Sequence, residues 1–304
     1  MDEIDSVRRK FYLVGVIPVA GQELDFGMPW HDCLQPVSSN YSAVEHAVVE
    51  CAYAGCDTIW IVCHDDMQPL IKHRLGDYVS DPQELHRSQY AKYPAMHRKD
   101  IPIFYVPIHP NDRDRRDCLA WSALYGCKTA YDVSRTVSVW TCPDKYYISF
   151  PYGIYNARLA QSKRKEIRKG KNFFFSHQGK TVADGEYLSF TITAKDFKRF
   201  IAIIKREGTG EYAPIAKVDV EKGIFPRLKL PLQERWSARF FSLQDVFRFD
   251  IIAEEDKHEL DWYFPIDNWE NYCKYIASPD KKVIKRPNKA FLACGTIKKI
   301  KQSI

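Results

Sequence analysis

Arginines and aspartates alternate between residues 109 and 117 (HPNDRDRRD), directly after a predicted strand. Ligand loops of open α/β sheets gather at such strand ends. The planar guanidinium groups of Arg113 and Arg116 suit paired contacts with phosphate oxygens, so both are candidate catalytic residues that clamp phosphates. The interleaved aspartates support a second interpretation, in which the arginines form only surface salt bridges.

Isolated carboxylates elsewhere in the chain are candidate ligands for Mg²⁺, which prefers one or two carboxylates together with substrate oxygens. Asp267 precedes a predicted helix, and Asp144 lies at the start of a predicted strand. Each also has a structural interpretation as a turn residue. His64-Asp65-Asp66 is a further metal candidate, although adjacent residues at a strand end rarely point the same way. No Ser-His-Asp or Cys-His arrangement has the spacing of a known family, so the sequence does not support nucleophilic catalysis.

The composition is that of a globular α/β protein with an ample core. The 304 residues are 45% hydrophobic and 14% aromatic. No apolar run approaches the roughly 18 to 20 residues that a membrane-spanning helix needs. The amino terminus resembles no secretion signal, and the nine cysteines contain no CxxC pair, which favours reduced thiols over disulfides or structural zinc. We therefore expect a cytoplasmic protein with no membrane partner.

Much of the net charge of +6 comes from residues 161–171 (QSKRKEIRKGK) and 281–301. A basic stretch beside a phosphate-bearing ligand would attract it. Nucleic-acid binding is not expected, because the stretch lacks interleaved aromatic residues and matches no nucleic-acid motif. A solvated loop or helix face is the third interpretation, and residues 161–171 are the predicted flexible loop.

The elements that must position these groups begin with a β-α-β unit. Residues 11–20 (FYLVGVIPVA) form a continuous apolar run, typical of a strand buried on both faces of a parallel sheet. Residues 42–54 predict a helix in which Ser42 and Glu45 have capping-box spacing and Gly55 ends the last turn. Residues 58–63 (TIWIVC) predict the second strand, completing a right-handed parallel crossover.

The rest of the chain alternates in the same way. Strands are predicted over residues 102–107, 146–150, 185–193 and 262–266, and helices over residues 67–75, 117–126, 194–206, 243–249 and 268–277. The helix over 117–126 is expected to end at Gly126. Alternating strands and helices predict an α/β fold with a mostly parallel central sheet and helices on both faces.

The order of these pieces resembles the sugar-phosphate nucleotidyltransferase family, whose domain is a glycosyltransferase-A-like Rossmann variant. Residues 16–21 (VIPVAG) followed by 34–37 (LQPV) are similar to the family's opening strand, Gly-rich loop and proline-containing segment. Residues 54–62 (AGCDTIWIV) resemble its following helix end and strand. Residues 262–272 (WYFPIDNWENY) resemble its W-x-D-(I/V)-G-T-x-E-x-Y segment, and residues 185–188 (GEYL) its sugar-binding strand.

The resemblance implies a single domain over residues 1–276, with a nucleotide-binding half (11–150), a sugar or acceptor half (172–276) and a basic tail (277–304). It implies transfer of a nucleotidyl group from a nucleoside triphosphate to a sugar phosphate, with Mg²⁺. The implied sites are nucleotide-binding Ala20, Gly21, Gln22, Gly27 and Pro36; sugar-binding Gly185, Glu186 and Tyr187; catalytic Arg113, Arg116 and Asp267; and metal-binding Asp267 and Asp144.

Departures from the family pattern keep two other functions open. The expected glycine-rich loop contains Glu23 and Asp25, the family's catalytic lysine falls at Asp32, and its metal-binding aspartate falls near Tyr152. Acids repel a triphosphate unless a metal lies between them. One alternative is a non-catalytic protein of the same fold, used for binding or assembly. The other is a nucleotide-sugar-dependent glycosyltransferase, for which Asp65-Asp66 and Asp112-x-Asp114 are the nearest D-x-D matches. The base, the sugar and the oligomeric state are left open.

Overall fold

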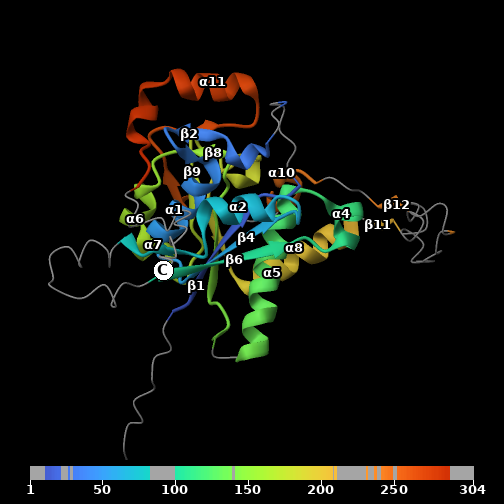
Figure 1. Ribbon diagram of the computed structural model, residues 1–304. Coiled ribbons are helices and arrows are strands. Elements are labelled where there is room, and N and C mark those ends of the chain that lie inside the picture. The colour runs from blue at the N-terminus through green and yellow to red at the C-terminus, as the bar shows by residue number, and fades with distance from the viewer. Residues whose placement is uncertain are drawn as a thin grey trace, which may run out of the picture.

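An eight-stranded, mostly parallel sheet runs through the molecule (Figure 1). The computed structural model describes residues 11–21, 27, 30–82, 100–138, 141–207, 209–210, 231, 236–237, 241–248 and 252–287. The strand order is β13-β9-β10-β7-β1-β4-β6-β5. These strands are β1 (Leu13–Pro18), β4 (Thr58–Cys63), β5 (Tyr78–Ser80), β6 (Asp100–Pro107), β7 (Lys145–Ile148), β9 (Phe174–Ser176), β10 (Phe190–Ile192) and β13 (Lys257–Glu259).

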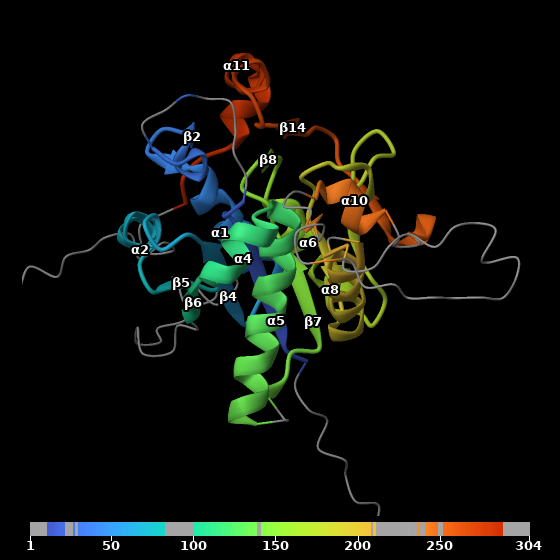
Figure 2. The same ribbon diagram turned by 90° about the vertical axis from the view of Figure 1, so that its right-hand side faces the viewer.

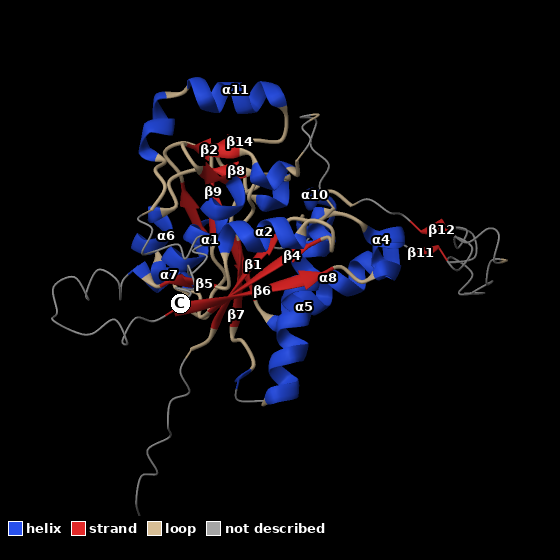
Figure 3. Cartoon of the chain, viewed as in Figure 1, coloured by secondary structure: helices blue, strands red, loops and turns tan. Residues whose placement is uncertain are grey.

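Helices and short strand pairs surround this sheet (Figures 2 and 3). The helices are α1 (Ala43–Ala54), α2 (Gln68–Leu75), α4 (Pro110–Arg116), α5 (Leu119–Val137), α6 (Arg158–Ser162), α7 (Arg164–Ile167), α8 (Ala194–Glu207), α10 (Leu243–Phe247) and α11 (Trp269–Ala277). The pairs are β2 (Pro36–Ser38) with β3 (Tyr41–Ser42), β8 (Gly153–Ile154) with β14 (Phe264–Pro265), and β11 (Thr209–Gly210) with β12 (Trp236–Ser237).

The predicted fold class is confirmed by the position of β1. This strand pairs in parallel with β4 on one side and with β7 on the other, so it lies inside the sheet. Its successive side chains point to opposite faces: Gly15 meets Cys51 of α1, whereas Val16 meets Gly126 of α5. Helices therefore cover both faces, and β5 and β10 are the antiparallel members.

The ends of α1 are where the sequence predicts them. Glu45 accepts hydrogen bonds from the backbone N–H (2.8 Å) and the hydroxyl (3.1 Å) of Ser42. Gly55 ends the helix with a φ of +86°, in the left-handed region that glycine adopts without strain. Almost the whole helix is buried, not one stripe of it, because α6 and β3 pack against it in addition to the sheet.

Helix α5 overturns the prediction of a short helix ending at Gly126. It continues for 19 residues to Val137. A Cβ at Gly126 would lie 2.6 Å from Val16 Cγ1 and 2.8 Å from Val62 Cγ2. The glycine therefore lets the helix approach β1 and β4 closely, and it does not terminate the helix. In Figures 1 and 2 the far end of α5 projects away from α11.

The basic stretch at residues 161–171 was predicted to be a flexible loop, and this prediction is wrong. It contains α7 and lies at the amino ends of β1, β4 and β7. Arg164 Nη2 forms an ion pair with Asp81 at 2.9 Å. Arg168 donates to the carbonyls of Gly55 (2.7 Å) and Phe11 (2.6 Å). Ligands of such sheets bind at the carboxyl ends of the strands. These arginines lie at the amino ends, so they do not attract a phosphate-bearing ligand to that site.

Two predicted strands are shorter than expected. Only Phe190–Ile192 of the segment 185–193 joins the sheet as β10, and only Phe264–Pro265 of 262–266 is extended as β14. Residues 185–189 have no regular structure and follow a 3₁₀ turn, Val182–Asp184, whose capping-box hydrogen bonds link Thr181 and Asp184. Arg286, which belongs to the predicted basic tail (277–304), forms an ion pair with buried Glu45, with its Nη2 atom 3.3 Å from Oε1.

Two buried titratable residues of α1, His46 and Glu50, make the stability of the fold depend on pH. His46 lies between the rings of Tyr41 and Tyr155, and burial lowers its pKa to about 4. Its ordinary pKa is near 6.5, so between these values the unfolded chain binds a proton that the folded chain excludes. Stability is therefore lost as the pH falls from about 6.5 towards 4. Burial also raises the pKa of Glu50, which gives a slope of the opposite sign.

We predict that His46→Gln removes the histidine's share of this dependence. The wild-type protein should lose about 2 kcal/mol more unfolding free energy than the variant between pH 7.5 and pH 5, because the linkage acts over about 1.5 pH units of this interval, from about 6.5 down to 5, at about 1.36 kcal/mol for each. Urea denaturation of both proteins at the two pH values measures the difference. Glu50 is present in both and cancels. Equal losses would show that His46 does not titrate in this way.

Candidate functional site

The carboxyl ends of the parallel strands, at the point where the chain connections reverse direction, are where open α/β sheets bind ligands. Here the reversal lies between β1, which continues through α1 to β4 on one side, and β7 on its other side. Five sequence-predicted residues fall at or next to this point: Gly21, Asp32, Tyr152, Tyr187 and Asp267.

The bend after β1 rests on the start of α5. Gly21 has a φ of +80°, and a Cβ there would lie 2.5 Å from backbone atoms of Cys118. The hydroxyl of Ser122 donates to the Ala20 carbonyl at 2.6 Å. The Ala20 N–H donates to the Val62 carbonyl at 3.1 Å, so this amide is not available to a phosphate, contrary to what the predicted nucleotide loop requires. Gln22 lies outside the described residues, and Gly27 has a φ of +59°.

Tyr152 fills the space between the ends of β1 and β7. It is fully buried, and its hydroxyl donates to the Val19 carbonyl at 3.2 Å. Burial raises its pKa, with a further contribution from the nearby charge of Asp32. Its ring meets that of Tyr187 edge to face, with centroids 5.9 Å apart. An aromatic side chain therefore occupies the space between β1 and β7 next to the predicted nucleotide-binding residues Ala20 and Gly21.

The predicted sugar-binding segment packs on the same tyrosine. The Tyr187 N–H donates to the Tyr263 hydroxyl at 2.9 Å, and a Cβ at Gly153 would lie 2.0 Å from the Tyr187 carbonyl oxygen. Gly185 takes a φ of +95° just before it. Glu186 lies 3.6 Å from Lys180 in an ion pair. The segment 185–187 thus lies beside the carboxyl end of β7.

Asp267 lies in the same place, held by the first residues of α11. The Ile266 N–H donates to the Tyr152 carbonyl at 2.8 Å. Asp267 Oδ1 accepts hydrogen bonds from the side-chain amides of Asn268 (3.0 Å) and Asn271 (2.7 Å). The described residues offer Oδ2 no hydrogen bond, so this oxygen has the capacity to bind a cation.

Asp144 is separated from Asp267 by the length of β7. Its Oδ2 accepts the Tyr12 N–H at 2.7 Å, at the amino end of the sheet. Between Asp144 and Asp267, β7 extends for four residues, about 13 Å at the rise of a strand. The two carboxylates therefore cannot hold one ion together. Among the described residues no three His, Cys, Asp or Glu side chains converge as a metal site, so Mg²⁺ fits only as one carboxylate plus substrate oxygens.

The candidate arginines lie on α4, over the ends of β4 and β6, and each faces an acid. Arg113 Nη2 is 3.6 Å from Asp65 Oδ2. Arg116 Nη1 is 3.5 Å from Asp112 Oδ1. The guanidinium of Arg116 also lies 5.0 Å from the centre of the Trp121 ring. The Arg116–Asp112 pair is a salt bridge of the second sequence interpretation, whereas Arg113 pairs with Asp65, outside the segment 109–117. Both pairs engage aspartates that the glycosyltransferase alternative would need for a metal.

Two histidines complete this edge. His64 Nε2 is 3.4 Å from Asp117 Oδ1, so His64 pairs across to α4 and does not join a metal cluster with the two aspartates that follow it. His31 was missed by the sequence reasoning, since a lone histidine in a loop carries no motif. Burial lowers its pKa, with a further contribution from nearby His64, and its Nδ1 accepts the Cys33 N–H at 3.2 Å.

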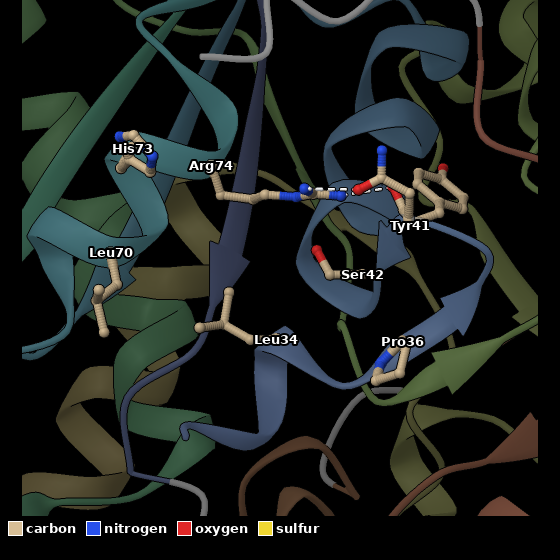
Figure 4. A pocket seen from close by; sticks show the side chains of 8 residues that line it. Leu34, Pro36, Tyr41, Ser42, Leu70, His73 and Arg74 are labelled. Atoms are coloured by element: carbon tan, nitrogen blue, oxygen red, sulfur yellow. Dashed lines mark hydrogen bonds between the residues drawn. The ribbon is translucent and has the colours of Figure 1, made fainter. Parts of the chain in front are cut away.

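Pro36 lines a separate hollow of about 340 Å³ between α2 and the β2–β3 pair (Figure 4). The lining residues are Leu34, Pro36, Asn40, Tyr41, Ser42, Leu70, His73 and Arg74. Arg74 crosses the hollow to donate to Asn40 Oδ1 (3.0 Å) and forms an ion pair with Glu45 (2.8 Å). The Tyr272 hydroxyl donates to the Pro36 carbonyl at 2.7 Å and so joins this wall to α11. Gly21 is not among the lining residues.

The structure thus brings together some predicted residues and separates others. Tyr187 and Ile266, the residue before Asp267, contact Tyr152, and Tyr152 in turn bonds to Val19, two residues before Gly21, at the carboxyl ends of β1 and β7. Arg113 and Arg116 also lie at the carboxyl ends of the parallel strands, beyond β4 and β6. Asp144 lies at the other side of the sheet, at the amino ends of the strands. No described helix is both long enough and apolar enough to cross a membrane.

No protein-family model matches this chain, and no curated protein matches it by sequence. Solved structures do match. A protein from Bacillus anthracis assigned as a glucose-1-phosphate thymidylyltransferase has a TM-score of 0.50 and 10% identity, over 91% of this chain and 98% of that one. An apo UDP-glucose pyrophosphorylase has a TM-score of 0.49 and 11% identity, over 90% and 100%. The first match shows that this chain has the fold of sugar-phosphate nucleotidyltransferases, which confirms the resemblance of the sequence.

Proposed function

We propose that this protein binds a nucleoside triphosphate and a sugar phosphate and transfers the nucleotidyl group to form a nucleotide-sugar. The observation that supports this most is that Tyr187 and the residue before Asp267 both contact Tyr152, which bonds to Val19 just before Gly21, at the switch point of a fold used by such enzymes. A cytoplasmic location would suit substrates of this kind. The finer assignment of roles follows from the contacts described above.

In this proposal Asp267 holds Mg²⁺ through Oδ2, while the amides of Asn268 and Asn271 fix the carboxylate through Oδ1. Bound magnesium would neutralise charge that develops on the transferring phosphoryl group. The segment 185–187 would orient the sugar phosphate, since Tyr263 and Gly153 fix its backbone. Arg116 would face phosphate oxygens only by exchanging its contact with Asp112.

The direct test incubates the full chain with each nucleoside triphosphate and common sugar phosphates and measures pyrophosphate release with and without magnesium. We expect release in one combination, dependent on magnesium. Asp267→Asn should lower the rate at least tenfold, which corresponds to about 1.4 kcal/mol of transition-state free energy. The matched control is Asp261→Asn, an exposed carboxylate six residues earlier. Absence of pyrophosphate across the whole panel would contradict the proposal.

A second function, nucleotide binding without transfer, is favoured by one specific observation. Tyr152 stands near the position of the family's metal-binding aspartate, and it is buried with its hydroxyl engaged on Val19. Asp32 stands at the position of the catalytic lysine, close enough to influence the pKa of Tyr152. A thermal-shift screen separates the two functions: stabilisation by a nucleotide without pyrophosphate release would support binding alone.

A further inference from the structure

The hollow between α2 and the β2–β3 pair has the size and the lining of a small-molecule site. Its volume of about 340 Å³ lies within the range of about 300–1,000 Å³ that such sites occupy. Half of its lining residues carry apolar or aromatic side chains, namely Leu34, Pro36, Tyr41 and Leu70. Leu70 is 53% exposed, so a ligand in the hollow would remove apolar surface from water.

The side of the hollow formed by Arg74 is positively charged. Arg74 extends from α2 across the hollow (Figure 4) and forms an ion pair with Glu45 Oε2 at 2.8 Å. Arg286 Nη2 lies 3.3 Å from the other oxygen of the same buried carboxylate. Arg286 Nε is covered and makes no hydrogen bond. Two guanidinium groups therefore share one carboxylate, and the three side chains together carry one net positive charge.

The Asn40 side chain marks the position where a ligand oxygen would bind. Arg74 Nη1 donates to Asn40 Oδ1 at 3.0 Å, and Asn40 is an exposed turn residue that also lines the hollow. A carboxylate oxygen in the place of this neutral amide would add the attraction of opposite charges to the hydrogen bond. The corner therefore suits an anion better than the amide that occupies it.

We propose that this hollow binds a small carboxylic acid with an apolar body, at a site separate from the switch point. The apolar body would cover Leu34 and Leu70, and the carboxylate would replace Asn40 as the partner of Arg74 Nη1. The apolar walls disfavour a sugar phosphate, whose hydroxyl groups would lose water without gaining partners. A purely apolar molecule would leave the positive charge unmatched. The inference goes beyond the proposed transfer reaction and does not depend on it.

Calorimetry on the full chain tests the proposal with octanoate, octanol and acetate. Octanoate should bind roughly tenfold more tightly, or better, than octanol, which has the same apolar body without the charge. It should exceed acetate, which has the charge without the body, by at least the same factor of roughly ten. Equal binding of octanoate and either partial ligand would overturn the proposal, as would no binding of octanoate. Pyrophosphate release in the assay above decides the proposed function separately.

Variants locate the ligand. Arg74→Gln and Leu70→Ser should each weaken octanoate binding by roughly fivefold or more, and Leu70→Ser leaves the ion pair with Glu45 in place. Asn40→Gly should strengthen binding, because it removes the competing acceptor, and the φ of +54° at this position suits glycine.

The matched control is Lys72→Gln, an exposed cation of the same helix that does not line the hollow. It should leave octanoate binding unchanged. Unfolding midpoints without ligand report whether each variant folds. A folded Leu70→Ser protein that binds octanoate as the wild type does would place the ligand elsewhere and overturn the proposal.

Discussion

Replacing Gly21 with alanine is expected to destabilise the fold by about 2 to 5 kcal/mol. The left-handed φ of +80° costs a residue with a side chain about 1–2 kcal/mol. The new Cβ would also lie 2.5 Å from backbone atoms of Cys118. Backbone cannot rotate aside as the end of a side chain can, so α5 or β1 must shift, at about 1–3 kcal/mol. Urea denaturation measures the sum.

Gly179 provides the matched control for this substitution. It has a φ of +76°, and nothing lies within 4 Å of a Cβ built on it. Gly179→Ala should therefore show the cost of the left-handed backbone alone, and the difference between the two variants isolates the contact with α5. If the two variants lost equal stability, the close approach of α5 to the bend would not be a constraint, and the picture of a bend supported by Cys118 would fail.

Lys145→Met is expected to cost about 3 to 5 kcal/mol and to loosen residues 163–171. Lys145 is 1% exposed. Its ammonium donates to the carbonyls of Ile167 (3.0 Å), Lys169 (3.0 Å) and Lys171. Burial lowers its pKa to about 8, which still leaves it charged at neutral pH. Methionine has a similar shape but no donor, so three carbonyls lose their partner, at about 1–3 kcal/mol for each that stays buried.

Two measurements test this prediction. Denaturation gives the free energy of unfolding, and limited digestion with trypsin reports opening of the segment, which contains Lys163, Arg164, Lys165, Arg168, Lys169 and Lys171. The control, Lys165→Met, changes an exposed lysine of α7 and should alter neither the stability nor the cleavage after the other five residues. Unchanged digestion of Lys145→Met would mean that the ion pairs of Arg164 and Arg168 hold the segment by themselves.

Local patterns in the sequence determined the elements of the nucleotide-binding half. Residues 58–63 form a strand with the predicted bounds, and α1 begins after Ser42 and ends before Gly55 as predicted. A capping box and a left-handed glycine act over three to five residues, and a buried strand is defined by its own apolar run. For the same reason, the order of the elements was enough to predict the α/β fold class.

Contacts between distant residues decided what these patterns could not. In the sequence Gly126 indicates a helix end, but in the structure it lies in the middle of α5 and faces β1 and β4. Asp144 and Asp267 read as a pair, yet β7 separates them. The basic stretch reads as solvated, yet Asp81 and backbone carbonyls bind its arginines.

The physical reason is the same in each case. Sequence spacing specifies the partners of a backbone group within one helix, and the face of a strand on which each side chain lies. The neighbour of a side chain across the sheet depends on strand order and register, which arise only when the whole chain packs. Tyr152 shows this most directly: its residue type gave no sign that it closes the switch point, and only the packing of β1 against β7 placed its hydroxyl on the Val19 carbonyl.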